Sequence, residues 1–219
     1  MVRPGPFDTR AAEYDRWFDE HRAVYASELE AVRSLLPEHS RSIEVGVGTG
    51  RFAQPLGIPL GVEPSAAMRE IARSRGIEVV DAVAEDLPFG DASFDLLLIV
   101  TTICFVDDVD RTLKEAHRVL TDGGHILVGL LDRDTELGRK YEARKSDSEF
   151  YSLARFRSSA EVLAALERAG FGELTSAQAV FDSATEPEGS PPRVESGHGS
   201  GLFVVVRGCR AASDARAPN

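Results

Sequence analysis

Apolar positions follow two different spacings along this chain. In residues 10–36 they recur every three or four positions, the spacing of one face of an α-helix, and Pro37 ends the pattern. From residue 42 onward, short apolar runs alternate with amphipathic stretches. The pattern predicts one leading helix followed by a series of strands and helices.

Five apolar runs in the first two thirds of the chain are predicted strands. Their continuous apolar character is typical of parallel strands that are covered on both faces. Helical spacing fills two of the intervals, at residues 65–76 and 109–124. Strands that alternate with helices indicate βαβ units and a parallel sheet. The five runs are residues 42–50, which end in glycines, 58–63, 77–82, 94–102 and 125–131.

The last third has a different composition. Residues 158–173 predict a helix that starts at Ser158 or Ser159 and ends at Gly170. Two more strands are predicted at residues 174–181 and 201–208. The segment between them, 182–200, is too polar and too rich in Pro, Gly and Ser for a strand, and we expect residues 208–219 to form a frayed tail.

Composition limits the classes of partner. The 219 residues, of which 42% are apolar, suffice for one domain with a substantial core. A formal net charge of −11 disfavours nucleic acid and an anionic membrane surface, so a small-molecule substrate is expected. Both a monomer and a homodimer are compatible with this composition.

The cysteines and the hydropathy of the chain indicate whether it holds a metal and where in the cell it is expected. Cys104 and Cys209 provide neither a disulfide scaffold nor clustered metal ligands, so we expect no metal. No segment is apolar for long enough to span a membrane, and residues 1–10 lack the apolar core of a signal peptide. We expect a cytoplasmic protein.

A glycine-rich turn gives the sharpest local signal. The sequence EVGVGTG, residues 44–50, follows a predicted strand, and glycine lets a ligand approach the backbone closely. A dinucleotide fingerprint would need a glycine where this chain has Arg51, and no Gly-Lys-Ser/Thr follows as in a phosphate-binding loop. The short interval before residue 58 leaves room for only one or two helical turns.

Five blocks in order along the chain resemble class I S-adenosylmethionine-dependent methyltransferases, in particular the small type-11 domains of bacteria and archaea related to ubiquinone/menaquinone biosynthesis methyltransferases. The resemblance extends over residues 10–207. The blocks are AAEYDRWF, IEVGVGTGRF, GVEPSAAM, AEDLPFGDASFDLLL and the stretch from KEAHRVLTDGGHILVG to AGF.

The resemblance implies an α/β, Rossmann-like fold. Its sheet would have seven strands, mostly parallel, in the order 3-2-1-4-5-7-6, with the last strand antiparallel and helices on both faces. Residues 1–219 would form a single domain. Its parts would be a helical lid at 10–36, a cofactor-binding half at 40–131, a substrate-side insertion at 132–157 and a C-terminal half at 158–207.

The implied cofactor is S-adenosylmethionine, with S-adenosylhomocysteine as product. Its methionine portion and ribose would lie on the turn formed by Gly46, Gly48 and Gly50. Glu44 would bind its ammonium group, and its carboxylate would lie at the helix start near Thr49. Glu63 would accept hydrogen bonds from both ribose hydroxyls, because a carboxylate offers two acceptor oxygens.

Two groups of residues would enclose the adenine. One side would be formed by Pro64, Ser65 and Met68, and the other by Ala84, Glu85, Asp86 and Leu87. Many relatives have Asp where this chain has Val83. Recognition of the adenine amino group therefore falls to Glu85, to Asp86 or to the backbone.

The leading helix and the fourth strand would face the transferred methyl group. Tyr14 and Trp17 match the lid block, in which the tyrosine reaches the cofactor carboxylate and an aromatic face attracts the sulfonium. Thr101 and Thr102 would lie nearest the methyl group. The acceptor would contact Tyr14, Tyr25, Thr102 and Asp132, although the tyrosines also fit a plain apolar helix stripe.

Two segments give opposite indications about the acceptor. The insertion at 132–157 mixes Lys and Arg with aromatic residues, which suits an anionic or aromatic molecule, whereas the 182–200 loop carries three Glu and His198, which suits a cationic amine. His21 and His198 are the candidate proton acceptors. Some close relatives are labelled as amine N-methyltransferases, but the fold and the cofactor motif do not fix the acceptor.

These observations predict an S-adenosylmethionine-dependent methyltransferase that moves a methyl group by in-line displacement to a small-molecule acceptor, with an amine nitrogen among the candidates. Direct displacement needs proximity and alignment, so an obvious catalytic dyad is not required. Two alternatives stay open: a protein that binds S-adenosylmethionine or S-adenosylhomocysteine without transfer activity, and an NAD-dependent oxidoreductase, which Arg51 disfavours.

Overall fold

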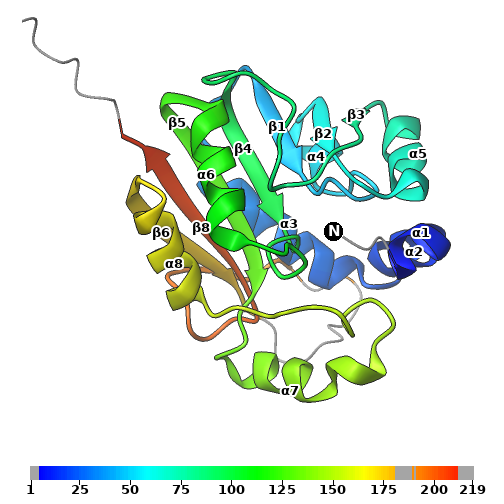
Figure 1. The fold of residues 1–219 in the computed structure, drawn as a ribbon. Coiled ribbons are helices and arrows are strands. Elements are labelled where there is room, and N and C mark those ends of the chain that lie inside the picture. Colours follow the sequence, from blue (N-terminus) through cyan, green and yellow to red (C-terminus); the bar gives the residue numbers. More distant parts are fainter. Residues whose placement is uncertain (1–4, 181–188, 190, 212–219) are drawn as a thin grey trace, which may run out of the picture.

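A single mixed β-sheet organises the chain (Figure 1). The computed structural model describes residues 5–180, 189 and 191–211. Within them the strand order is β3-β2-β1-β4-β5-β8-β6-β7. The strands are β1 (Ser42–Val45), β2 (Leu60–Val62), β3 (Glu78–Val80), β4 (Phe94–Val100), β5 (Leu120–Leu131), β6 (Phe171–Ala179), β7 (Val194–Ser196) and β8 (Phe203–Arg210).

The strand directions confirm the predicted class. Strands β1 to β5 pair in parallel, whereas β8 runs antiparallel to both β5 and β6. With β7 set aside, the order agrees with the predicted 3-2-1-4-5-7-6. The expected number of strands was wrong, because residues 194–196 of the segment expected not to form a strand pair with the edge of β6. A short polar edge strand has no apolar pattern to reveal it.

Helices cover both faces of the sheet (Figure 1). In β4, Leu96 and Leu98 pack into a core cluster with α3 and α4, whereas Leu97 and Ile99 pack into a second cluster with α6 and α8. Both faces of the sheet are therefore shielded from water, which explains why the predicted strands are continuous apolar runs. The helices are α1 (Pro6–Thr9), α2 (Ala11–Glu20), α3 (Arg22–Leu35), α4 (Ala53–Leu56), α5 (Ala66–Ser74), α6 (Val109–Val119), α7 (Glu136–Arg144), the 3₁₀ turn η1 (Lys145–Asp147) and α8 (Ser159–Arg168).

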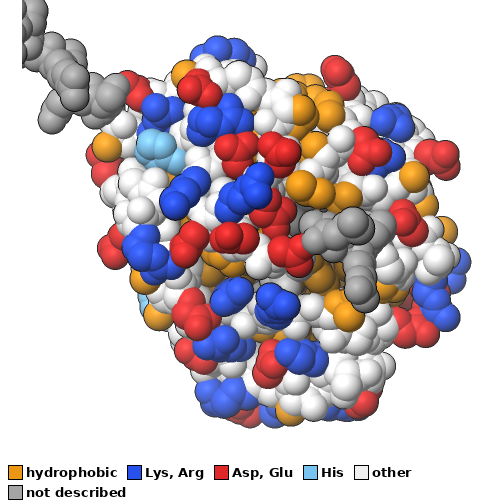
Figure 2. Space-filling view, viewed as in Figure 1, with side chains coloured by type: hydrophobic (Ala, Val, Ile, Leu, Met, Phe, Trp, Pro, Cys, Tyr) orange, Lys and Arg blue, Asp and Glu red, His pale blue; other side chains and the backbone are white. Residues whose placement is uncertain are grey.

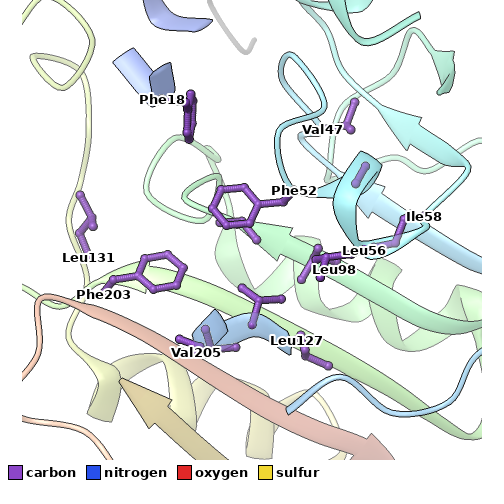
Figure 3. Close-up of a cluster of buried hydrophobic side chains, with 14 of the residues drawn as sticks. Phe18, Val47, Phe52, Leu56, Ile58, Leu98, Leu127, Leu131, Phe203 and Val205 are labelled. Atoms are coloured by element: carbon purple, nitrogen blue, oxygen red, sulfur yellow. The ribbon is translucent and has the colours of Figure 1, made fainter. Parts of the chain in front are cut away.

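An aromatic row connects the leading helices to the sheet. Figure 3 shows Phe52, which precedes α4, between Phe18 of α2 and Phe203 of β8. The ring centroids of Phe52 and its two neighbours are 6.3 Å apart on each side. Such contacts add to the burial of apolar area. They connect α2 to the segment that follows the glycine turn.

Several predicted boundaries differ from the structure. The leading helix is broken at His21 into α2 and α3, because the His21 backbone leaves the helical region and its ring nitrogen contacts the Trp17 carbonyl oxygen. Helix α6 ends at Val119, and Leu120 begins β5 by pairing with Phe94. The predicted one- or two-turn helix after the glycine turn is confirmed by α4.

Element boundaries in the last third of the chain also differ from the predictions. Helix α8 begins with a capping box between Ser158 and Glu161 but stops at Arg168, so that β6 starts at Phe171. Strand β8 continues to Arg210, into the expected tail, and residues 212–219 lie outside the described part of the chain.

Charge is distributed evenly on the face drawn in Figure 2, where basic and acidic side chains are interspersed. None of the helices in the described part of the chain has the length and apolar character needed to cross a bilayer. Over the same residues, no group of His, Cys, Asp and Glu is arranged to hold a metal ion.

Candidate functional site

A cavity of about 310 Å³, here called the first cavity, lies where β1, β2 and β4 end. The carboxyl edge of a parallel sheet is where such folds bind ligands. Ten of the predicted cofactor residues line it: Tyr14, Gly46, Gly48, Glu63, Pro64, Met68, Ala84, Glu85, Thr101 and Thr102. The structure thus brings together side chains from four of the five sequence blocks.

The glycine turn shapes one wall of the first cavity. Gly46 and Gly48 have φ angles of +72° and +53°, which favour glycine. A Cβ on Gly46 would overlap the Thr102 side chain, and one on Gly48 would enter space that the Tyr14 ring borders at 4.0 Å. A ligand can therefore lie directly on the peptide groups of this turn.

Glu63, just after β2, is held by two backbone donors. Its Oε2 accepts a hydrogen bond from the Gly48 N–H at 3.0 Å, and its Oε1 accepts one from the Ser65 N–H at 2.9 Å. Burial raises the pKa of Glu63, and the two N–H donors offset part of that rise. Each oxygen keeps a lone pair toward the cavity, which suits a pair of hydroxyl donors.

Two further buried carboxylates have an oxygen without a partner. Glu44 Oε2 and Glu85 Oε2 receive no hydrogen bond from any described residue. Glu44 accepts one bond from the Ala53 backbone, and burial raises its pKa. Glu85 uses Oε1 for the N–H groups of Asp107, at 2.7 Å, and Asp108. Unmatched buried oxygens are expected where a ligand supplies the missing donors.

Other predicted cofactor residues support the walls of the first cavity without lining it. Ser65 caps α5 by accepting a hydrogen bond from the Met68 N–H, and its hydroxyl donates to the Phe7 carbonyl oxygen of α1. Asp86 is exposed. Besides these two, the predicted residues that do not line the cavity are Glu44, Thr49, Gly50, Leu87 and Trp17.

A second cavity of about 210 Å³ lies on the other side of Tyr14 and Thr101, which line both cavities. Thr101 has a φ of +48°, which is rare for a β-branched residue and is typical of functional sites. The lining of the second cavity is Glu13, Tyr14, Trp17, Phe18, Glu20, Val24, Glu28, Phe52, Thr101, Leu131, Leu137, Tyr141, Phe150, Tyr151 and Leu202.

An ion-pair cluster fastens α2 to the glycine turn. The Asp15 carboxylate is 2.8 Å from Arg51 and 2.8 Å from Arg75, while Arg75 also donates to the Thr49 carbonyl oxygen. Burial opposes ionisation of Asp15, but the two guanidinium groups outweigh it and lower its pKa to about 2. Arg51, which departs from the dinucleotide pattern, thus holds the lid.

The predicted acceptor residues do not all meet at the cavities. Tyr14 lines both, and Thr102 lines the first. Tyr25 lines neither and donates its hydroxyl hydrogen bond to the Arg51 carbonyl oxygen. Asp132 is buried, and its oxygens accept hydrogen bonds from the Asp134 N–H and the Ser159 hydroxyl, a structural role.

The two candidate histidines lie outside both linings. His21 stacks on Trp17, with ring centroids 4.6 Å apart. His198 is exposed, and the neighbouring loop residues 181–188 and 190 lie outside the described chain. Sequence reasoning missed Phe7 of the first cavity, because it lies in no recognised block. Arg155, which also lines this cavity, was expected only as one of the basic residues of the insertion that suit an anionic or aromatic acceptor.

Comparisons with known proteins agree with this geometry. A family model described as a methyltransferase domain matches residues 43–128. A crystal structure of an S-adenosylmethionine-dependent methyltransferase from Thermotoga maritima, described as a possible histamine N-methyltransferase, has a TM-score of 0.89 and 51% identity. That match covers 93% of this chain and 97% of the other.

Two curated relatives extend the comparison. An uncharacterized protein of Methanocaldococcus jannaschii is 44% identical over 200 residues, which cover 91% of this chain and 96% of that protein. A malonyl-[acyl-carrier protein] O-methyltransferase of Geobacter sulfurreducens is 33% identical over 204 residues, which cover 80% of this chain and 70% of that protein.

Proposed function

The chain belongs to the class I S-adenosylmethionine-dependent methyltransferases, and from this membership we propose that it transfers a methyl group to a nitrogen of a small amine. The observation that carries the proposal is the pair of cavities that meet at Tyr14 and Thr101. One cavity has room for the methyl donor, and the other for the acceptor.

Residues that line the first cavity, and Glu44 outside its lining, fit the donor. Glu63 has free lone pairs for the two ribose hydroxyls, while the open space over Gly48 accepts a ligand on the backbone. The unpartnered oxygen of Glu44 suits the amino group of the methionine portion, and that of Glu85 suits the adenine amino group. Bound S-adenosylmethionine supplies a methyl group on a sulfonium, from which an incoming nitrogen displaces it.

The chain's own residues align the partners and exclude water. A neutral amine nitrogen forms its bond to the methyl carbon as the carbon–sulfur bond breaks, with the electron pair staying on sulfur and the positive charge passing to nitrogen. Tyr14 and Thr101, which border both cavities, would set the approach of the nitrogen. Phe18 and Phe52 close the site from the core side.

The choice of an amine rests on chemistry and on one relative. The second cavity has acidic and aromatic residues but no Lys, Arg or His in its described lining. The Thermotoga maritima relative, described as a possible histamine N-methyltransferase, extends over nearly the whole chain. Both favour a cationic amine over an anionic acceptor.

Calorimetry with S-adenosylhomocysteine and with NAD tests the donor, and mass spectrometry after incubation with S-adenosylmethionine and a panel of amines tests transfer. We expect S-adenosylhomocysteine to bind, NAD not to bind, and at least one amine to gain a methyl group. NAD binding alone would identify an oxidoreductase. Binding of S-adenosylhomocysteine without transfer to any amine, thiol, phenol or carboxylate would identify a cofactor-binding protein instead.

A further inference from the structure

The second cavity contains a buried acid that no predicted role includes. Glu28 lies on α3, and its side chain reaches the cavity between the lid and the insertion. The residue is 6% exposed. Burying a carboxylate away from water is costly unless something compensates its charge.

Glu28 differs from the other buried acids of the described chain in having no hydrogen-bond donor. Glu44, Glu63, Glu85 and Asp132 each accept at least one backbone N–H. No hydrogen bond or ion pair within the described residues reaches the Glu28 carboxylate, and burial raises its pKa from 4.5 to about 8. The fold thus leaves one acid open for a partner that the described residues do not supply.

Aromatic rings surround this acid. The chain has four tyrosines, and each of them, Tyr14, Tyr25, Tyr141 and Tyr151, is close enough for the charge of Glu28 to raise the pKa of its hydroxyl, with burial as the larger cause. All but Tyr25 line the cavity, together with the rings of Trp17, Phe18, Phe52 and Phe150. Aromatic faces attract cations, most strongly where water is excluded.

The basic residues of the insertion do not offset this negative character. Lys140 pairs with Glu136 at 2.8 Å, and Arg139 donates to the Asp134 carbonyl oxygen. Neither lines the second cavity, whereas Tyr141 of the same helix does. The insertion therefore presents aromatic rings to the cavity and keeps its charges outside, which disfavours an anionic acceptor.

We infer that the second cavity binds the methyl acceptor as an organic cation, a small amine with an aromatic or aliphatic body, and that Glu28 is the counter-ion of its ammonium group. Because an ammonium nitrogen has no lone pair, the Glu28 carboxylate takes its proton before transfer, and the neutral nitrogen then attacks the methyl carbon. A desolvated ion pair inside a ring of aromatic faces selects a cation over a neutral molecule of the same shape. The inference deepens the proposed function and rests on it, because an amine acceptor requires the donor in the first cavity.

The test compares phenethylamine with phenethyl alcohol, which has the same shape without the charge. Both are titrated at about pH 7 into the protein loaded with S-adenosylhomocysteine. Two buffers of different ionisation enthalpy are used, so that proton release on binding can be measured. We compare wild type, Glu28→Gln, and the control Glu30→Gln, whose carboxylate lies on the same helix and pairs with Arg33. A titration of S-adenosylhomocysteine into the empty protein is done first, and it measures the affinity of the donor site separately.

Wild type and Glu30→Gln should bind the amine at least about tenfold more tightly than the alcohol, as expected for a desolvated charge pair. They should release a proton on binding, since Glu28 is protonated in the empty cavity at that pH. Glu28→Gln should lose both the preference and the proton release while it keeps the affinity for the alcohol.

Equal affinities of wild type for the amine and the alcohol, no binding of either probe, or an undiminished preference in Glu28→Gln would overturn the inference. If S-adenosylhomocysteine still binds in that case, the donor site stands and only the acceptor assignment is wrong. If S-adenosylhomocysteine does not bind, the proposed function itself is wrong, and the acceptor assignment loses its basis with it.

Discussion

The two cavities meet at Tyr14 and Thr101 but are built in different ways. The first is made from segments that directly follow parallel strands, and its acids are held by backbone N–H groups, as Glu63 is held by Gly48 and Ser65. The second is lined mostly by residues of α2, α3 and the insertion, and its buried acid, Glu28, has no donor among the described residues. The first is prepared for hydroxyl and amino donors, and the second for a charge that the ligand brings.

The difference between the two cavities suggests how one fold can keep the same methyl donor while the methyl acceptor differs from protein to protein. Backbone donors fix the geometry of the first cavity independently of most side chains. Side chains alone define the second cavity, so substitutions there change the acceptor without disturbing the donor site. The following variants test whether the two cavities are separable in this way.

Glu63→Ala should have the largest effect on ligand binding, and only on binding of the donor. Loss of a charge-assisted acceptor for the ribose should weaken S-adenosylhomocysteine binding by about 1–3 kcal/mol. Calorimetry measures this change, with Glu28→Gln as the matched control that should keep donor affinity. An undiminished affinity in Glu63→Ala would remove the ribose role, and an equal loss in Glu28→Gln would contradict the separation of the cavities.

Glu28→Gln should stabilise the empty protein at high pH. The pKa of Glu28 is raised in the folded state to about 8. Between the unfolded value near 4.5 and about 8 the folded protein holds a proton that the unfolded chain has lost, so wild-type stability falls as pH rises through this window. The four tyrosine hydroxyls near Glu28 have raised pKa values and stay neutral there.

Urea unfolding at about pH 5 and about pH 8.5 measures the difference. We expect Glu28→Gln to match wild type at the lower pH and to exceed its free energy of unfolding by about 4 kcal/mol at the higher pH. Glu30→Gln should show no such dependence. A constant difference between Glu28→Gln and wild type would mean that Glu28 is not buried as an unpaired acid.

Tyr14→Phe should have the smallest effect and should affect both cavities, because Tyr14 lines each of them. Loss of one hydroxyl should weaken S-adenosylhomocysteine and phenethylamine binding by about 0.5–1.5 kcal/mol each. Tyr25→Phe is the matched control, since the Tyr25 hydroxyl donates outside both cavities. A change confined to one ligand would place the Tyr14 hydroxyl in that cavity alone.

The sequence predicted the first cavity far better than the second, for a physical reason. Glycines with positive φ, strand ends and an acid after β2 are local features with fixed spacing, so the local pattern together with the family resemblance pointed to Gly46, Gly48 and Glu63, which line the first cavity. Glu28 lies among apolar residues of an amphipathic helix, where a single acid is normally a solvated residue. Its burial comes from tertiary packing, since α3 lies against β6 and β8 and Glu28 faces a cavity that residues of α2 and the insertion also line.

The same contrast holds for the fold. Buried strands β1, β2, β4 and β5 were predicted because both of their faces are apolar. Strand β7 was missed because it is short and polar, with only Val194 packed against the core. The break at His21 was missed since apolar spacing continues across it, and it depends on a contact between the His21 ring and the Trp17 carbonyl oxygen. Local sequence patterns therefore suffice to predict the strands of the sheet, whereas the break between α2 and α3 depends on contacts that the pattern does not contain.

The most direct test of the two-cavity account is a crystal structure of the protein with S-adenosylhomocysteine and phenethylamine bound together. We predict the ribose hydroxyls on Glu63 in the first cavity and the ammonium group beside Glu28 in the second, with Tyr14 and Thr101 between the two ligands. A nucleoside bound away from Glu63, or an amine bound outside the second cavity, would contradict the account.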